Sequence, residues 1–207
     1  MAPITRGEVG PIRKAKKVLY VTVFLMAVMI VLLWTSGLFG LWFHGMAFVA
    51  NNTKQFTEKG HPVDGAYSFQ VDLSSLESNI GKEIFNDGEH RIYVSWLQKT
   101  YNGGYDIGFR SSGQYSLAGA TLISGVHHAT INDHSFTMST TAKLTAEYKG
   151  NLYNTQATGQ CGLNYKDGDC FSFSFFLSDG ANKENVESTG IVGFTITDLY
   201  QNIWRKK

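Results

Sequence analysis

No Asp, Glu, Lys or Arg lies between Lys17 and Lys54 in this chain of 207 residues. The run from Val18 to Phe43 is rich in Val, Leu, Met, Phe and Trp. About 20 helical residues cross the hydrocarbon core of a bilayer, and each central Leu, Ile, Phe or Val favours insertion by roughly 0.3–0.6 kcal/mol. The absence of charge therefore predicts a transmembrane helix over 18–43.

A cleaved signal peptide is the alternative interpretation of this run, but its apolar core would be only about 7–15 residues long. The longer run favours an uncleaved signal-anchor. Residues 1–17 contain five basic residues and one acidic residue, a net charge of +4 that leaves −3 for the rest of this +1 chain. The positive-inside bias then predicts a single-pass type II protein of the cell membrane, with a cytoplasmic N-terminus.

These signals divide the chain into four parts. We expect a cytoplasmic basic N-terminus (1–17), the signal-anchor (18–43), a juxtamembrane stalk (44–65) and an extracytoplasmic β-rich domain (66–207). The stalk is expected because residues 51–65 are polar and contain glycine. Asn51-Asn52-Thr53 is a glycosylation sequon, which has meaning only in a eukaryotic secretory pathway, and its closeness to the membrane disfavours its use.

No amphipathic helix of ten or more residues separates the strand-like segments, which excludes a βαβ arrangement. Apolar and polar residues instead alternate, as in strands with one buried face, over 67–73, 92–96, 105–109, 135–139, 142–148, 171–175 and 192–196. Turn-forming pairs such as Asp87-Gly88 lie between them. The pattern predicts an all-β fold of about nine strands, an antiparallel sandwich or barrel. One or two short helices are expected, over 76–84 after a Ser74 or Ser75 cap and over 199–204.

Cysteine is scarce, with only Cys161 and Cys170 in the chain. No CxxC spacing and no neighbouring His supports a redox or metal-binding dithiol. Asp167-Gly168 is a strong hairpin signal between the two cysteines, and a hairpin brings its strands within disulfide reach. We expect a structural disulfide, which requires an oxidising compartment and so agrees with the predicted topology.

The sequence also lacks a G-x-S-x-G motif and a glycine-rich phosphate loop before a helix, and its mildly acidic domain gives no reason to expect nucleic-acid binding. Asp167 and Asp169 provide too few oxygens for Ca²⁺. The candidate metal ligands are His127, His128, Asp133 and His134. Neighbouring residues of a strand face opposite sides, and residues 132–134 resemble a turn. We therefore expect a polar hairpin tip and no cofactor, with a metal-dependent enzyme as an alternative.

Tyrosines remain as candidate binding residues, because exposed aromatic rings on a sheet stack on sugars or anchor protein partners. The candidates are Tyr101, Tyr105, Tyr115, Tyr153 and Tyr165. The absence of catalytic motifs favours a non-catalytic binding or assembly module, anchored in the bilayer through 18–43, for a protein partner in the envelope or at the cell surface. A carbohydrate- or wall-binding lectin-like domain is the other alternative.

Overall fold

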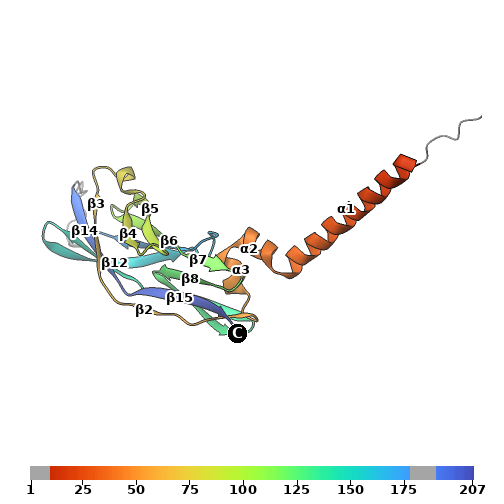
Figure 1. Cartoon of the computed structure of the whole chain (residues 1–207). Helices are drawn as coiled ribbons and strands as arrows, with labels where there is room; N and C mark the ends of the chain where they lie inside the picture. Colours follow the sequence, from red (N-terminus) through yellow and green to blue (C-terminus); the bar gives the residue numbers. More distant parts are fainter. Residues whose placement is uncertain (1–9, 178–189) are drawn as a thin grey trace, which may run out of the picture.

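The computed structural model describes residues 10–177 and 190–207 (Figure 1). Residues 1–9, which include Arg6 of the basic N-terminus, lie outside the described part. The described helices are α1 (Gly10–Thr35), α2 (Leu38–His44), α3 (Met46–Asn51) and the 3-10 helix η1 (Glu77–Asn79). The strands are β1 (Phe56–Glu58), β2 (His61–Val63), β3 (Tyr67–Asp72), β4 (Glu83–Asn86), β5 (Arg91–Lys99), β6 (Tyr105–Ser112), β7 (Gln114–Ser116), β8 (Gly119–Ser124), β9 (Val126–Asn132), β10 (Ser135–Thr140), β11 (Lys143–Tyr148), β12 (Asn151–Gln160), β13 (Cys170–Phe175), β14 (Ile191–Thr197) and β15 (Leu199–Lys206).

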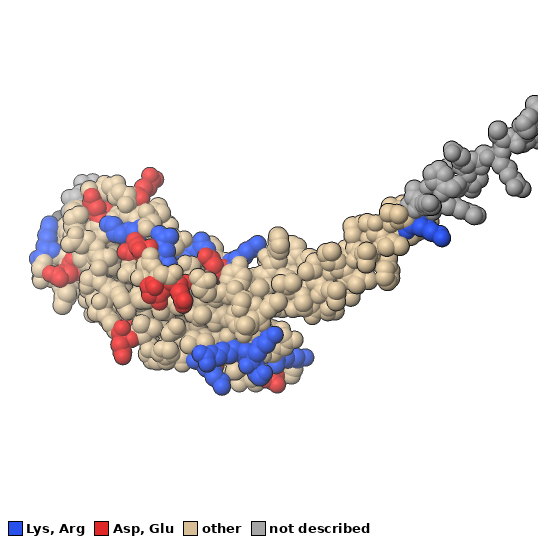
Figure 2. Space-filling model, in the orientation of Figure 1, with Lys and Arg blue, Asp and Glu red and all other residues tan. Residues whose placement is uncertain are grey.

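Helix α1 projects away from the β-rich domain (Figure 1). Its stretch Lys16–Thr35 contains 20 residues, none of them buried, and is long and apolar enough to anchor the chain in a membrane. Figure 2 shows no charged residue along the visible face of α1 beyond its beginning. The helix ends earlier than the expected span of 18–43, because Gly37 adopts a left-handed φ of 82° and starts the separate helix α2.

Eight strands form the main sheet, in the order β3-β14-β11-β12-β13-β6-β5-β4, with antiparallel neighbours throughout. Its two outer strands, β3 and β4, contact each other, so the sheet curls into a nearly closed barrel. This confirms the expected all-β, barrel-like fold. Every segment predicted from alternation lies in a strand or at its end.

The core of the main sheet is rich in phenylalanine. Phe194 stacks on Phe69 at 5.3 Å between ring centroids and meets Phe175 edge-on at 5.0 Å. Phe109 and Phe171 continue the cluster at 5.2 Å. All five side chains are buried, and full burial of a phenylalanine contributes about 1.5–3 kcal/mol by transfer from water.

The second sheet has the order β1-β15-β8-β7, and β2 also pairs with β15. The helix expected over 199–204 is wrong, because β15 is a strand with hydrogen-bonded neighbours on both sides. Leu199, Ile203 and Trp204 have helical spacing, but a polar residue, Asn202, takes an inward position on the strand and is fully buried. The sequence pattern therefore conceals the alternation.

The helix expected over 76–84 is reduced to η1, and Ile84 belongs to β4. Ser74 does not cap a helix: its hydroxyl donates to Asp72 Oδ1 at 2.6 Å. Asn79 is fully buried and donates to the carbonyls of Asp72 and Ser75 at 2.8 and 2.9 Å. These bonds fold the segment into a tight turn because they satisfy the backbone in place of a longer helix.

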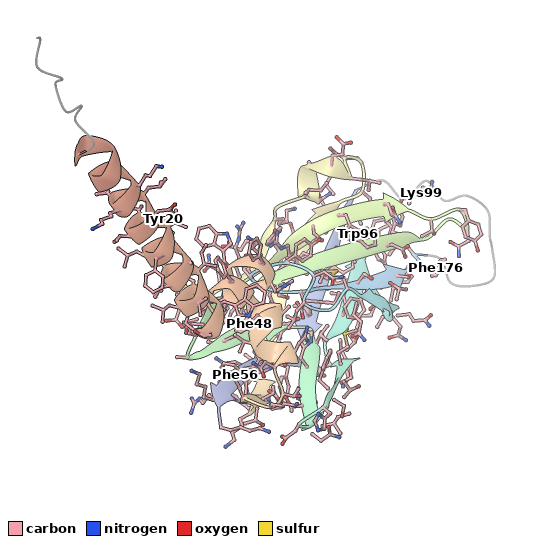
Figure 3. All side chains as sticks on the ribbon, turned by 90° about the vertical axis from the view of Figure 1, so that its right-hand side faces the viewer. Tyr20, Phe48, Phe56, Trp96, Lys99 and Phe176 are labelled. Carbon is pink, nitrogen blue, oxygen red and sulfur yellow. A yellow bond between two sulfur atoms is a disulfide. The ribbon has the colours of Figure 1, made fainter. Side chains whose placement is uncertain are left out.

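The juxtamembrane segment 44–65 is not the polar spacer that was expected. Met46 and Val49 on α3 are fully buried in a second apolar cluster, together with Phe56, Leu122 and Trp204. Figure 3 shows Phe48 and Phe56 within the region where α2 and α3 meet the second sheet. The chain therefore passes from α1 into the folded domain without an extended linker.

Candidate functional site

A cavity of about 470 Å³ lies where α2, α3, the β9–β10 hairpin and residues 161–170 meet. This volume falls within the range of about 300–1,000 Å³ that is usual for small-molecule sites. We call it the juxtamembrane cavity, because its helices directly follow α1. Its lining includes Ala50, His128, Trp204 and Leu163, with Phe136 and Met138 contributed by β10.

The segment Cys161–Cys170, here called the disulfide loop, forms one wall of the cavity. The Cys161–Cys170 disulfide is present, with 5.3 Å between the Cα atoms. Cys161 N donates to Cys170 O at 3.1 Å, and Tyr165 pairs with Gly168 in a β-bridge, so the turn is Lys166-Asp167, one residue before the expected Asp167-Gly168. The sequence prediction of a hairpin closed by a disulfide is therefore confirmed.

The disulfide loop is attached to the junction of α2 and α3. Met46 N donates to Lys166 O at 2.7 Å. The neighbouring Gly45 has φ 56°, and a Cβ atom there would lie 2.1 Å from Lys166 O. Only glycine allows this close approach, so the loop and the juxtamembrane helices hold one another in position.

Arg110 of β6 braces the loop from the other side. Its guanidinium lies over the Tyr165 ring at 4.0 Å from the centroid and pairs with Asp167. Partial burial alone would lower the pKa of Arg110, but the facing Asp167 carboxylate and the Tyr93 hydroxyl together outweigh it and the net shift is upward. Arg110 Nε is the one buried side-chain polar atom without a hydrogen-bond partner in the described ranges.

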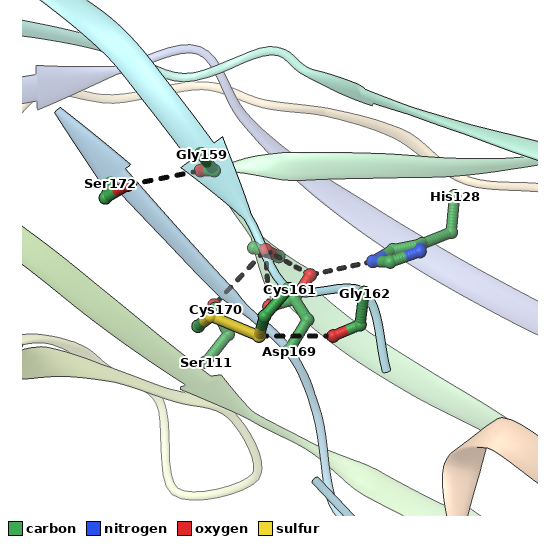
Figure 4. Close-up of a disulfide and its surroundings, with 9 residues drawn as sticks. Ser111, His128, Gly159, Cys161, Gly162, Asp169, Cys170 and Ser172 are labelled. Atoms are coloured by element: carbon green, nitrogen blue, oxygen red, sulfur yellow. Dashed lines mark hydrogen bonds and ion pairs between the residues drawn. A yellow bond between two sulfur atoms is a disulfide. The ribbon is translucent and has the colours of Figure 1, made fainter. Parts of the chain in front are cut away.

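His128 lies at the floor of the cavity and is held by a buried polar network (Figure 4). Its Nε2 lies 2.7 Å from Asp169 Oδ2, and Ser124 Oγ donates to both Asp169 oxygens at 2.8 Å. Ser111 Oγ donates in turn to Ser124 Oγ at 3.2 Å. Asp169, Ser124 and Ser111 have no exposed surface, and His128 is 4% exposed.

The network uses only one of the two ring nitrogens of His128, which is a lining residue of the cavity. A neutral imidazole that donates through Nε2 presents Nδ1 as an acceptor. No described residue is hydrogen-bonded to His128 Nδ1. This nitrogen is therefore available for a hydrogen bond with a molecule in the cavity.

Asn202 connects this network to the second sheet. It accepts a hydrogen bond from His128 N at 2.8 Å through Oδ1 and donates to Val126 O at 2.9 Å through Nδ2. The rings of His128 and Trp204 lie 6.0 Å apart. The backbone of β9 is therefore fixed on β15, which sets the position of His128.

The four candidate metal ligands do not converge. His127 faces the other side of β9, where it stacks on Tyr200 at 4.0 Å and lies 3.1 Å from Glu58 Oε2. Asp133 and His134 lie in the exposed turn between β9 and β10, and Asp133 pairs with Lys207. Among the described residues no group of three or more His, Cys, Asp or Glu side chains could hold a metal ion. The expected turn is present, but His128 lies in a strand, not at the hairpin tip.

The five candidate tyrosines are also separated. Tyr105 is buried and stacks on Phe175, which rules it out as a surface contact. Tyr153 packs against the main core, and Tyr115 against the second cluster. Tyr101 is fully exposed at the β5–β6 turn, while Tyr165 lies on the cavity wall beneath Arg110. Only Tyr165 therefore belongs to the candidate site.

The rim of the cavity carries positive charge without acidic groups. Lys166 and His44 are exposed and line it, as do the neutral Asn51 and Asn164. No Asp or Glu side chain is among the described residues that line the cavity. The lining therefore suits a neutral or anionic molecule better than a cation.

Sequence reasoning missed Ser124, Asp169, Asn202 and Trp204 as parts of the site. They come from three separate segments, and their residue types are ordinary for turns and strands. Asp169 precedes Cys170, so its closeness to the predicted disulfide was the one available signal. No family model, curated protein or solved structure matches this chain.

Proposed function

We propose that this protein is a membrane-anchored, non-catalytic binding module that binds a component of the envelope or cell surface at the juxtamembrane cavity. The observation that carries the proposal is the cavity itself, with its apolar wall and the free nitrogen of a buried histidine. The absence of a nucleophile or metal cluster at His128 in the described lining favours binding over catalysis.

The proposed topology has a cytoplasmic N-terminus and an extracytoplasmic β-rich domain. Two features support it: the excess of basic residues before the apolar helix, and a disulfide, which persists in oxidising compartments. The component to be bound would then be one that reaches the outer face of the membrane. Helix α2 adds exposed Trp42 and Phe43 at this level, immediately after the membrane helix.

Photo-crosslinking in intact membranes tests the binding site. Phe136 is 49% exposed on the cavity wall and is replaced by a photoreactive phenylalanine analogue. Leu152 is exposed on β12 away from the cavity and provides the matched control. We expect an adduct of defined mass at position 136 and none at 152. Equal labelling at both positions, or none at 136, would contradict the proposal.

Cysteine labelling of whole cells tests the topology separately. We expect Tyr101→Cys, at the exposed β5–β6 turn, to react with a membrane-impermeant maleimide without permeabilisation. Ala2→Cys should react only after permeabilisation. The reverse pattern would place the domain in the cytoplasm and end the proposal of an envelope ligand.

A further inference from the structure

We infer that the ligand of the juxtamembrane cavity is a single-chain amphiphile with a carboxyl head group, that is, a fatty acid. This inference rests on the proposed function, since it names the ligand of the same cavity. Three features of the lining carry it: the free nitrogen at the floor, the apolar walls, and the positive rim without acids.

The floor selects the head group. His128 lines the cavity and its Nε2 is held by Asp169, which leaves Nδ1 as the ring nitrogen available to a ligand. A carboxyl group and an imidazole share one proton: either the acid O–H donates to Nδ1, or the N–H of the imidazolium donates to the carboxylate. Both arrangements form one hydrogen bond, and the Asp169 carboxylate stabilises the second because it faces the other N–H of the charged ring.

The walls accept the chain. Phe136 and Met138 of β10 and Leu163 of the disulfide loop line the cavity together with Trp204. Methionine is unbranched and flexible, so it adapts to a chain that itself has many conformations. None of Phe136, Met138 and Leu163 offers a charged or strongly hydrogen-bonding group, so this part of the lining suits a hydrocarbon chain better than a sugar.

The residues at the rim of the cavity determine which sign of charge the ligand carries. Lys166 and His44 provide positive or protonatable groups, and no acidic side chain in the described lining opposes them. A cationic amphiphile would therefore lack a counter-charge, whereas an anion gains favourable interactions on entry. This separates a carboxylic acid from an amine of the same chain length.

The position of the cavity gives the route of entry. Phe43 of α2 lines the cavity and is 65% exposed. Only two residues, Ser36 and Gly37, separate the end of α1 from the start of α2. An apolar surface therefore continues from the membrane helix to the cavity. A fatty acid in the adjoining leaflet can reach the cavity along this surface without its chain crossing water.

Calorimetric titration of the full chain in lipid nanodiscs tests the inference, with empty nanodiscs subtracted. Octanoate, octanol and octylamine share one chain and differ in the head group. We expect octanoate to bind about tenfold more tightly than octanol, with octylamine the weakest. If octanol or octylamine binds as tightly as octanoate, the head-group assignment is wrong while the cavity remains a binding site.

Paired variants on β9 locate the interaction. His128→Gln keeps a donor for Asp169 but has no second ring nitrogen, so we expect about a tenfold loss for octanoate and little change for octanol. His127→Gln, one residue earlier and facing the other side, should leave both affinities within about twofold. Equal effects of the two variants would overturn the assignment of His128.

The exposed Lys166 provides a second variant that does not disturb the buried network. Lys166→Glu should weaken octanoate binding and leave octanol unchanged, and an unchanged octanoate affinity would overturn the role of the rim. If none of the three compounds binds above the empty nanodiscs, the inference fails. Photo-crosslinking at position 136 then decides separately whether the cavity binds another component.

Discussion

The main sheet and the second sheet differ in what they bury. The main sheet buries almost only apolar side chains, and its phenylalanines pack ring against ring. The second sheet, with α3, β9 and the disulfide loop, also buries Ser124, His128, Asp169 and Asn202. Buried polar groups stabilise less than apolar ones of the same size, and they require partners from distant segments.

The difference indicates a division of roles. An apolar, aromatic core supplies stability and tolerates no cavity without loss. The polar network between the sheets fixes one histidine at the floor of a cavity, which apolar packing alone would not orient. The second region is therefore where we expect binding, and the main sheet is the support that holds it.

The largest expected effect is in the main core. Phe194→Ala removes a ring that contacts Phe69 and Phe175, and we expect the free energy of unfolding to fall by about 3–5 kcal/mol. Ile191→Ala on the same strand is the control, since Ile191 is 52% exposed and should change stability by less than about 0.5 kcal/mol. Urea unfolding measures both. Equal losses would mean that the ring cluster is not the stabilising core.

The next effect concerns the disulfide loop. Replacing Cys161 and Cys170 together with serine should lower the free energy of unfolding by about 2–3 kcal/mol, because the unfolded chain regains the entropy of a short closed loop. Octanoate affinity should fall as well, since the loop forms a cavity wall. A variant with unchanged urea unfolding and unchanged affinity would show that the bond is not needed in the second region.

Asn202 tests whether the polar network stabilises this region. Asn202→Ala leaves His128 N and Val126 O without their partner, at an expected cost of about 2 kcal/mol. Gln201→Ala, the neighbouring and less buried position on β15, should stay within about 0.5 kcal/mol of the parent. Thermal unfolding compares the two. A neutral Asn202→Ala variant would mean that packing alone holds β9 on β15.

The smallest expected effect is at the exposed margin of the main sheet, where hydrogen bonds contribute little to the free energy of unfolding. The Ser74 hydroxyl, followed by the Ser74 N–H, lowers the pKa of Asp72 below its usual value near 4, against a small opposing effect of burial. Because the folded pKa is depressed, this stabilisation is present above the unfolded pKa and disappears as pH falls through the folded one.

Ser74→Ala should therefore lower Tm at pH 7 and match the parent at pH values below the folded pKa of Asp72. The measurement is Tm of both proteins across the acid range. Ser75→Ala is the control, and its difference from the parent should not vary with pH. A Ser74→Ala difference that persists unchanged in acid would show that the hydroxyl does not act through the carboxylate.

The sequence predicted the strands of the main sheet better than the strands of the second region. Alternation revealed β3, β13 and β14, because their inward positions are apolar throughout, and it revealed β6 over residues 105–109, before the buried Ser111. It missed β9 and β15, since His128 and Asn202 occupy inward positions as polar residues. β12 is largely exposed and gives little apolar signal, so it too was not predicted.

The sequence by itself determined the apolar helix, the β-rich class and the disulfide, because each depends on local properties: absence of charge, alternation of period two, and a short hairpin between two cysteines. Tertiary structure alone decided that residues 46–56 belong to the domain and that His128 faces a cavity beside Asp169. Those facts depend on which distant segments meet, and a buried polar residue looks like an exposed one until its partners are in place.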